Sequence, residues 1–309
     1  MAAGVLFAFI LCHVEGVIHN TPHRRELVYG NGSSSKGCNL VKSTTDGKFH
    51  MEKEFEDPVK HCLTGPPAKD GFGAHYTLFM TAVAFAAKNR ITYCHTPGSH
   101  VAHAQDNDQL KILMGFKAGN CSKCDREKHG YFHWVNEDPE AYYTPCVRNY
   151  LREKYDAGVE TLNLQSTFGR DENTTVIAVH IRRGDIDEET NHGNRYVKMS
   201  AFERGLEMIR KDYLKPREVH VFHVFSEGSP EDFKILTKHD DVELQLLGDD
   251  GMMTSFHSMV TADYLLTSPS SFSYAAGVLS KGKVFDIYPI IVCTDWRKSE
   301  FCDVRISGF

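Results

Sequence analysis

The chain has 309 residues, of which 41% are hydrophobic and 25% are charged, a globular composition long enough for one large or two medium domains. Its formal net charge is −6 at pH 7, so no global positive field favours binding to nucleic acid. Any anionic ligand must therefore be held by local positive charge.

The N-terminus carries the one long apolar run of the sequence, residues 2–12. The run is too short to span a bilayer comfortably and suits the apolar core of a signal peptide, with small residues near Gly16 as a cleavage site. A buried strand or helix is the alternative, since no Lys or Arg precedes the run. We expect a signal peptide or short hydrophobic leader over residues 1–18, no stable membrane span beyond it, and a place in the secretory pathway, in the Golgi or ER lumen or secreted.

Nine cysteines support the secretory interpretation. Removal of Cys12 with a signal peptide would leave eight, an even number compatible with disulfides. Three glycosylation sequons agree with it, at Asn31, Asn120 and Asn173. We therefore expect a glycoprotein with disulfide bonds.

A zinc site is a second interpretation of some of these cysteines. Cys121, Cys124, His129 and His133 are metal-ligand residue types at close spacing. Standard Cys2His2 fingers, however, separate their two pairs by about 12 residues, and a secreted protein uses such cysteines in disulfides. We expect disulfides, with structural zinc or free thiols as the alternatives. The acidic chain also argues against a zinc-knuckle nucleic-acid binder.

The first half of the chain shows the loop, helix and strand rhythm of an α/β unit. Its beginning is rich in Gly, Ser, Thr, Lys and Asn, which predicts a flexible leader over residues 19–56 and structure from about Asp57 onward. The apolar, Ala-rich run Tyr76–Lys88 predicts a largely buried helix, and Ile91–His95 predicts a short strand. Two further helices are expected at Gln109–Phe116 and Pro145–Tyr155.

The second half alternates strands and helices, which predicts a parallel sheet with helices on both faces. The expected strands are Val176–Ile181, Val219–Phe225, Val242–Leu247, Ala262–Thr267 and Val284–Tyr288. The expected helices are Ser200–Leu214, Pro230–Lys238 capped by Ser229, Thr254–Thr261 and Ser271–Leu279. We predict an α/β fold of two domains, residues 57–165 and 166–309, with a boundary near residues 157–172 and a ligand cleft between them.

Polar loops follow three of the predicted strands, at residues 180–185, 226–229 and 268–273. Because the carboxyl ends of parallel strands lie on one edge of a sheet, these loops should lie together. Arg182 and Arg183 offer forked donors that suit phosphate oxygens. Ser270 and Ser271 open a helix whose first backbone N–H groups attract anions. The sequence therefore predicts a site for the diphosphate of an activated sugar.

Each of these groups also has a structural interpretation. The arginines can form surface ion pairs with Asp185 or Asp187, and any of the serines can simply cap its helix. The tripeptide Arg183-Gly184-Asp185 matches a cell-adhesion sequence as well. Adhesion is disfavoured because a strand end beside a core run is poorly exposed.

The motif His180-x-Arg182-Arg183-Gly184-Asp185, together with Gly71-Phe72-Gly73 before a long helix, resembles the fucosyltransferase superfamily of GT-B glycosyltransferases. Residues 256–273 are similar to the third motif of that superfamily, in which a strand leads into a Ser-rich helix start. Ser226-Glu227 takes the place of the second motif. The resemblance covers roughly residues 65–290. It implies a GT-B-like fold, with two Rossmann-like domains whose parallel sheets face a cleft between them.

The resemblance implies a metal-independent glycosyltransferase without a cofactor, which moves fucose from GDP-fucose to a glycan or glycoprotein acceptor with inversion. Arg182 would hold the β-phosphate and His180 would orient it or the adjacent ribose, while Gly73 would let the N-terminal domain approach the donor. Asp185 joins the catalytic set as a candidate base, with Glu189 and His75 as the other candidates. The donor-binding residues implied are Gly71, Phe72, Gly73, His75, Arg183, Ser226, Glu227, His257, Ser270, Ser271, Phe272 and Ser273.

Two positions depart from the pattern of the superfamily. Ser255 stands where α1,6 members carry the acidic residue that reads guanine, although Asp249 and Asp250 lie nearby. Ala74-His75 replaces the amide-bearing pair that often follows the glycine loop. These departures motivate an alternative function, a catalytically inactive fucosyltransferase-like module that binds carbohydrate or protein.

Overall fold

A computed structural model describes residues 48–49, 62–65, 71–89, 91–96, 101, 107–119, 121–122, 124–126, 135, 138–168, 173–189, 195–246 and 251–287. These residues belong to one compact unit that extends from Cys38 to Phe309. The expected leader over residues 1–18 lies outside the described residues, as do Asn31, Asn120, His129 and His133.

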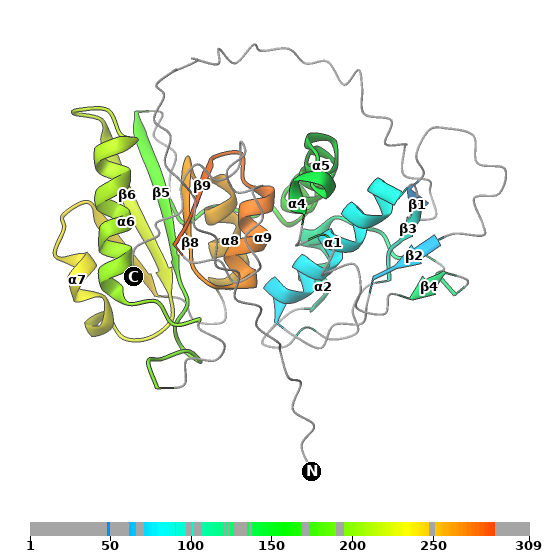
Figure 1. The fold of residues 1–309 in the computed structure, drawn as a ribbon, viewed down its shortest axis with the longest axis horizontal. Helices are drawn as coiled ribbons and strands as arrows, with labels where there is room; N and C mark the ends of the chain where they lie inside the picture. Colours follow the sequence, from blue (N-terminus) through cyan, green and yellow to red (C-terminus); the bar gives the residue numbers. More distant parts are fainter. Residues whose placement is uncertain are drawn as a thin grey trace, which may run out of the picture. The chain divides into compact units, whose positions relative to one another are not determined.

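A five-stranded parallel sheet forms the C-terminal half (Figure 1). Its strands are β5 (Thr174–Ile181), β6 (Val219–Ser226), β7 (Val242–Leu246), β8 (Tyr264–Thr267) and β9 (Lys283–Asp286). They lie in the order β7-β6-β5-β8-β9, and every neighbouring pair is parallel. This confirms the predicted parallel sheet. The strand expected from Ala262 begins later, at Tyr264. Asp263, just before it, accepts the backbone N–H of Val176 with its carboxylate at 2.9 Å.

Helices cover both faces of this sheet, as the apolar run of β5 requires. Ile177 and Val179 point into one core with α6 (Met199–Asp212). Val176 and Ala178 point into the other core, with α8 (Met252–Thr261) and α9 (Ser271–Leu279).

The prediction of one continuous α-helix at Pro230–Lys238 is wrong. The structure has a 3-10 turn, η1 (Pro230–Phe233), followed by a short helix, α7 (Lys234–Thr237). The backbone N–H of Asp232 donates to the carbonyl oxygen of Ser229 at 3.1 Å, a contact three residues apart that tightens the first turn. The Asp232 carboxylate in turn accepts the backbone N–H of Ser229 at 2.9 Å, so Ser229 does stand at the start of the turn.

The N-terminal sheet has four short strands in the order β1-β3-β2-β4. They are β1 (Lys48–Phe49), β2 (Cys62–Thr64), β3 (Thr92–Cys94) and β4 (Asp125–Arg126). The strand β2 is parallel to β3 and β4, whereas β1 runs antiparallel to β3. The α/β class is therefore confirmed, with a mixed sheet in place of the expected fully parallel one. The strand β1 lies inside the predicted flexible leader, since pairing with β3 gives two residues an ordered place that composition alone does not reveal.

The helices whose bounds the structure describes beside this sheet are α1 (Phe72–Asn89), α2 (Asn107–Met114), α4 (Pro139–Tyr142) and α5 (Pro145–Leu162). The predicted helix from Pro145 ends seven residues later than expected, at Leu162, where Asn163 adopts a left-handed conformation with φ 47°. Gly158 lies within the added turns. A Cβ there would overlap the backbone carbonyl of Ile112, so glycine allows α5 to contact α2 closely.

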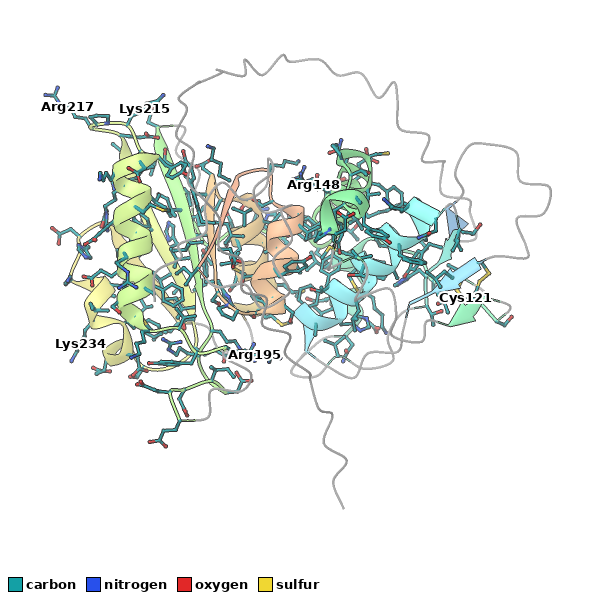
Figure 2. All side chains as sticks on the ribbon, viewed as in Figure 1. Cys121, Arg148, Arg195, Lys215, Arg217 and Lys234 are labelled. Atoms are coloured by element: carbon teal, nitrogen blue, oxygen red, sulfur yellow. A yellow bond between two sulfur atoms is a disulfide. The ribbon has the colours of Figure 1, made fainter. Side chains whose placement is uncertain are left out.

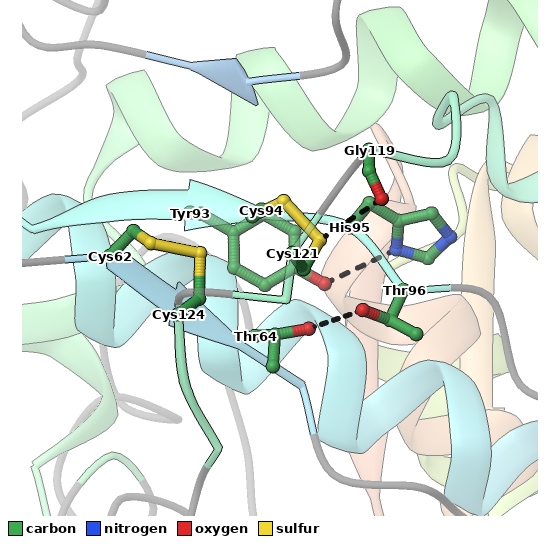
Figure 3. Close-up of a disulfide and its surroundings, with 9 residues drawn as sticks. All are labelled: Cys62, Thr64, Tyr93, Cys94, His95, Thr96, Gly119, Cys121 and Cys124. Atoms are coloured by element: carbon green, nitrogen blue, oxygen red, sulfur yellow. Dashed lines mark hydrogen bonds between the residues drawn. A yellow bond between two sulfur atoms is a disulfide. The ribbon is translucent and has the colours of Figure 1, made fainter. Parts of the chain in front are cut away.

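Two disulfides fasten the loop before β4 to opposite ends of the N-terminal sheet (Figure 3). Cys62, at the start of β2, bonds to Cys124, and Cys94, at the end of β3, bonds to Cys121. The expected disulfides are thus confirmed for these cysteines. Each of these sulfurs is already bonded to the sulfur of a second cysteine, so neither Cys121 nor Cys124 can bind zinc as a thiolate. The zinc interpretation of this motif is therefore wrong.

One apolar cluster joins the two sheets. It extends from Leu63 of β2 through the buried face of α1 to Leu265 of β8 and Leu279 of α9. Its packing places the start of α1 beside the start of α9, which matters for the site below. Within the described residues, no helix has the length and apolarity needed to cross a membrane.

Candidate active site

The carboxyl ends of β5 and β8 form the point at which the strand order of the parallel sheet changes direction. From β5 the chain continues outward to β6 and β7 on one side, and then returns to β8 and β9 on the other. In open α/β sheets ligands bind outside the strand ends at this point. Val179 of β5 pairs with Leu266 of β8, so the loops that begin at Arg182 and Ser268 lie on the same edge. The predicted meeting of these two loops is confirmed.

His180 and Arg182 are joined to the opposite loop through Ser268. The hydroxyl of Ser268 lies 3.0 Å from Nδ1 of His180 and accepts the backbone N–H of Arg182 at 3.2 Å. His180 is buried, and its ring lies 5.5 Å from that of Phe272. Burial, together with the charge of Arg182, lowers the pKa of His180 to about 3, so the imidazole is neutral at pH 7.

The Arg182 side chain is partly exposed to solvent, and one of its nitrogen donors has no partner among the described residues. One Nη donates to the Asp185 carboxylate at 2.6 Å, with the two side chains 32% and 58% exposed. This is the surface pair considered above, which is worth little at such exposure. Nε of Arg182 is buried and has no hydrogen-bond partner among the described residues. A buried guanidinium N–H without a partner is a donor available to an anionic ligand.

The neighbouring Arg183 points elsewhere. Its guanidinium donates to the carbonyl oxygens of Arg182 and Val197, at 2.8 and 2.7 Å, and lies 4.4 Å from the centre of the Tyr196 ring. These contacts hold residues 196–197 against the end of β5. The donor-binding role of Arg183 stays a prediction, and its present contacts are structural.

The first turn of α9 supplies the other side of the candidate site. Ser270 is the N-cap of the helix, and its hydroxyl accepts the backbone N–H of Phe272 at 3.3 Å. The hydroxyl of Ser273 donates to the backbone carbonyls of Ser268 and Ser270. Both hydroxyls therefore shape the turn, as the capping interpretation expects. The remaining N–H groups of a helix start, and its positive dipole end, suit an anion.

The glycine loop of the N-terminal half reaches the same place. A Cβ at Gly73 would overlap the backbone N and Cα of Phe272, so only glycine allows α1 to approach α9 this closely. The Phe72 ring lies 6.2 Å from the Phe272 ring, and the hydroxyl of Thr77 bonds to the carbonyl oxygens of Gly73 and Ser271. A Cβ at Gly71 would meet nothing within 4 Å, so crowding gives no reason for glycine there.

The second predicted motif also lies on this edge. Ser226 ends β6 and donates to the carbonyl oxygen of Ile181 at 2.7 Å, which ties the tips of β5 and β6 together. Gly184 has φ +87°, and a Cβ there would overlap the carboxylate of Glu227. The glycine therefore permits Glu227 to lie against the turn that follows Arg183.

Other predicted residues are placed less directly. His257 lies on α8, and its Nδ1 is 2.9 Å from the hydroxyl of Tyr155 on α5. His75 is buried on α1, burial lowers its pKa, and its Nδ1 has no hydrogen-bond partner among the described residues. Glu189 is exposed. Ser255, at the position where α1,6 members carry an acidic residue, is buried and bonds to the carbonyl oxygen of Gly251 in its own helix.

Ser268 contacts both His180 and Arg182, and the sequence reasoning did not single it out. It belongs to a run with three other serines, Ser270, Ser271 and Ser273, and nothing in the sequence separates their roles. Its position directly after the last residue of a predicted strand was the available signal, because that position faces the neighbouring strand tip.

Acid should destabilise the fold through buried histidines. Burial, and then the nearby His75, lower the pKa of His95 to about 3, a value like that of His180, against 6.5 for an ordinary histidine. The unfolded chain therefore binds more protons than the folded chain between pH 6.5 and 3, so stability is full above pH 6.5 and is lost as the pH falls. We expect each of these histidines to cost about 2 kcal/mol of unfolding free energy at pH 5. Urea unfolding at pH 7.5, 6 and 5 measures this loss.

The variant His180→Asn provides the matched comparison, because its amide oxygen can accept at the position of Nδ1. Its stability should fall less between pH 7.5 and 5 than that of the wild type. Identical pH dependence of the two proteins would contradict a neutral buried His180.

Comparison with known proteins places this site in a family context. Residues 111–305 match the model of the family described as glycosyl transferase family 11. This range includes the loops that begin at Arg182 and Ser268. Comparison with curated proteins found no match. The match confirms the expected likeness to fucosyltransferase-like enzymes.

Solved structures of low similarity include NodZ α1,6-fucosyltransferase co-crystallised with GDP, with 10% identity, coverage of 74% of this chain and 95% of that chain, and a TM-score of 0.40. Fucosyltransferase NodZ from Bradyrhizobium shows 11% identity, coverage of 72% and 94%, and a TM-score of 0.39. NodZ soaked with GDP-fucose shows 9% identity, coverage of 76% and 97%, and a TM-score of 0.40.

Proposed function

The chain belongs to glycosyl transferase family 11, and from this premise we propose that it transfers fucose from GDP-fucose to a glycan or glycoprotein acceptor, with inversion and without a metal ion. The observation that carries the proposal is the set of donors at the tips of β5 and β8. The Nε of Arg182, which has no partner among the described residues, the neutral ring of His180 and the start of α9 all suit a diphosphate.

Charge development explains how these groups would catalyse the transfer. The bond from the sugar to the diphosphate breaks as the acceptor hydroxyl approaches, and negative charge builds on the leaving phosphate. A guanidinium and helix-end N–H groups stabilise that charge where it develops. Such direct donors can serve in place of a metal ion, which supports the metal-independent form of the proposal.

The base that removes the acceptor proton is proposed to be Asp185. It lies three residues beyond Arg182, is exposed, and is held by a surface ion pair that substrate phosphate can replace. Glu189 is exposed as well. His75 is a weaker candidate because it is buried, although burial keeps it in the neutral form that a base requires.

The location proposed for this activity is the secretory pathway. The two described disulfides support it, because such bonds persist in oxidising compartments. Glycan and glycoprotein acceptors are found in the same compartments. Asn173 of one sequon is exposed immediately before β5, which is compatible with glycosylation there.

A donor screen tests the proposed function. Purified full-length protein is incubated with GDP-fucose, UDP-galactose or GDP-mannose and a panel of glycan acceptors, with and without EDTA, and product is detected by mass spectrometry. We expect transfer from GDP-fucose alone and equal rates in EDTA. Nucleotide binding without any transfer or donor hydrolysis would instead favour the inactive binding module.

A further inference from the structure

Ser268 connects two residues of the proposed donor site through a single hydroxyl. The residue follows β8 directly and is buried, with 4% of its surface exposed. Its hydroxyl lies 3.0 Å from Nδ1 of His180 and 3.2 Å from the backbone nitrogen of Arg182, both at the end of β5. The contacts therefore cross from one strand tip to its neighbour.

The chemistry of the partners sets the direction of both hydrogen bonds. A backbone N–H can only donate, so the Ser268 oxygen accepts from Arg182. The hydrogen of the hydroxyl then needs an acceptor, and of these two partners only Nδ1 of His180 can accept it. When Nδ1 accepts this hydrogen, the neutral imidazole carries its own hydrogen on Nε2.

Nε2 of His180 is left as an unused donor. No described residue accepts a hydrogen bond from it, just as none accepts from Nε of Arg182. The two donors belong to His180 and Arg182, which are two positions apart in the chain, at the end of the strand where the diphosphate is proposed to bind. A neutral ring that donates from Nε2 suits a phosphate oxygen.

We propose that Ser268 is a positioning residue for the leaving diphosphate. It holds the imidazole of His180 in the Nε2–H tautomer and fixes the backbone at Arg182, so that both side chains donate to the β-phosphate. The proposal rests on the proposed function, because the ligand it orients is the diphosphate of the nucleotide sugar. It assigns no proton transfer or bond cleavage to Ser268.

The backbone of Ser268 is itself held by the start of α9. Its carbonyl oxygen accepts the hydroxyl hydrogen of Ser273 at 3.2 Å and the backbone N–H of Ser270 at 2.6 Å. Through this turn, the helix start is kept in fixed relation to His180 and Arg182. One buried serine therefore aligns three sources of hydrogen-bond donors around one ligand position.

Calorimetric titration with GDP and with GMP tests the proposal, because GMP lacks the β-phosphate. We expect Ser268→Ala to lose about tenfold in affinity for GDP, the effect of one hydrogen-bond arrangement, and to keep the affinity of the wild type for GMP. The matched control is Ser258→Ala. Ser258 is also a buried serine. Its hydroxyl has three partners, the carbonyl oxygen of Thr254 and the backbone N–H and hydroxyl of Thr167, and none of them lies at the tips of β5 and β8. This control should keep both affinities.

A second measurement does not require Ser268→Ala to fold. Nitrogen-15 NMR of the histidine rings in the wild type reports which ring nitrogen carries the hydrogen, with His180→Asn identifying the signal of His180. We expect a protonated Nε2 and an unprotonated Nδ1 at pH 7.

The outcomes separate the two claims. If the wild type binds neither nucleotide, the proposed function fails and the role of Ser268 fails with it. If the wild type prefers GDP but Ser268→Ala keeps the same ratio of GDP to GMP affinity, the role of Ser268 is overturned and the proposed function stands. A hydrogen on Nδ1 of His180 overturns the role of Ser268 in the same way, whatever the titrations show.

Discussion

Replacing Arg182 by alanine is expected to lower kcat/KM for sugar transfer by about 10²–10³-fold, or roughly 3–4 kcal/mol of transition-state stabilisation. The guanidinium would meet the negative charge that develops on the leaving phosphate, and its Nε has no partner among the described residues. The fold should be retained, because the described side-chain partner of Arg182 is an exposed carboxylate at the surface. Initial rates with varied GDP-fucose, and a thermal unfolding curve of the same preparation, measure both effects.

Two further variants sharpen this test. Arg182→Lys keeps the charge but loses the forked donors, so it should recover only part of the activity. Arg217→Ala is the matched control, because Arg217 is exposed at the end of the sheet opposite to the site (Figure 2). The control should have the rate of the wild type. An Arg182→Ala variant that turns over normally would remove the proposed role of this residue.

Replacing Phe256 by alanine is expected to lower the free energy of unfolding by about 3–5 kcal/mol, the usual cost of a large cavity in a core. Phe256 is fully buried on α8. Its ring centre lies 5.0 Å from that of Phe72, 5.4 Å from that of Phe272 and 5.9 Å from that of Tyr155. It therefore fills the space among α1, α5, α8 and α9, where no smaller side chain can make the same contacts.

Urea denaturation at pH 7.5 measures the free energy of unfolding of Phe256→Ala and of the wild type. The comparison is Val219→Ala, at a residue that is 60% exposed, where a change within about 0.5 kcal/mol is expected. Equal stability of the two variants would show that the aromatic cluster does not hold these helices together. Because Phe272 also contacts His180, Phe256→Ala should weaken nucleotide binding as well as the fold.

Much of the C-terminal half was predictable from the sequence, because its elements are long and regular. The helix Ser271–Leu279 has the predicted bounds, and the strand β5 differs from its prediction only by two earlier residues. Alternating buried strands and amphipathic helices leave few other arrangements than a parallel sheet. The shared edge of the loops at Arg182 and Ser268 follows from that parallel order, so this part of the site was predictable too.

The N-terminal sheet was less predictable, because its strands have only two or three residues. Lys48–Phe49 and Asp125–Arg126 show no hydrophobic period that could mark them as strands. They become strands because the backbones of β3 and β2 form hydrogen bonds with them. The choice between zinc and disulfides at Cys121 and Cys124 was also decided by neighbours in space, since their partners Cys94 and Cys62 are distant in the sequence.

The sequence by itself determined the class of the fold, the edge of the sheet that bears the polar loops, and the kinds of donors available there. Only the tertiary structure decided which hydrogen-bond partners each of several similar residues has. Arg182 keeps a donor without a partner among the described residues, whereas adjacent Arg183 donates to backbone carbonyls. Ser268 faces the neighbouring strand tip, whereas Ser270 and Ser273 shape a helix start. The physical reason is that hydrogen bonding depends on the direction and surroundings of each side chain, which residue type and spacing do not specify.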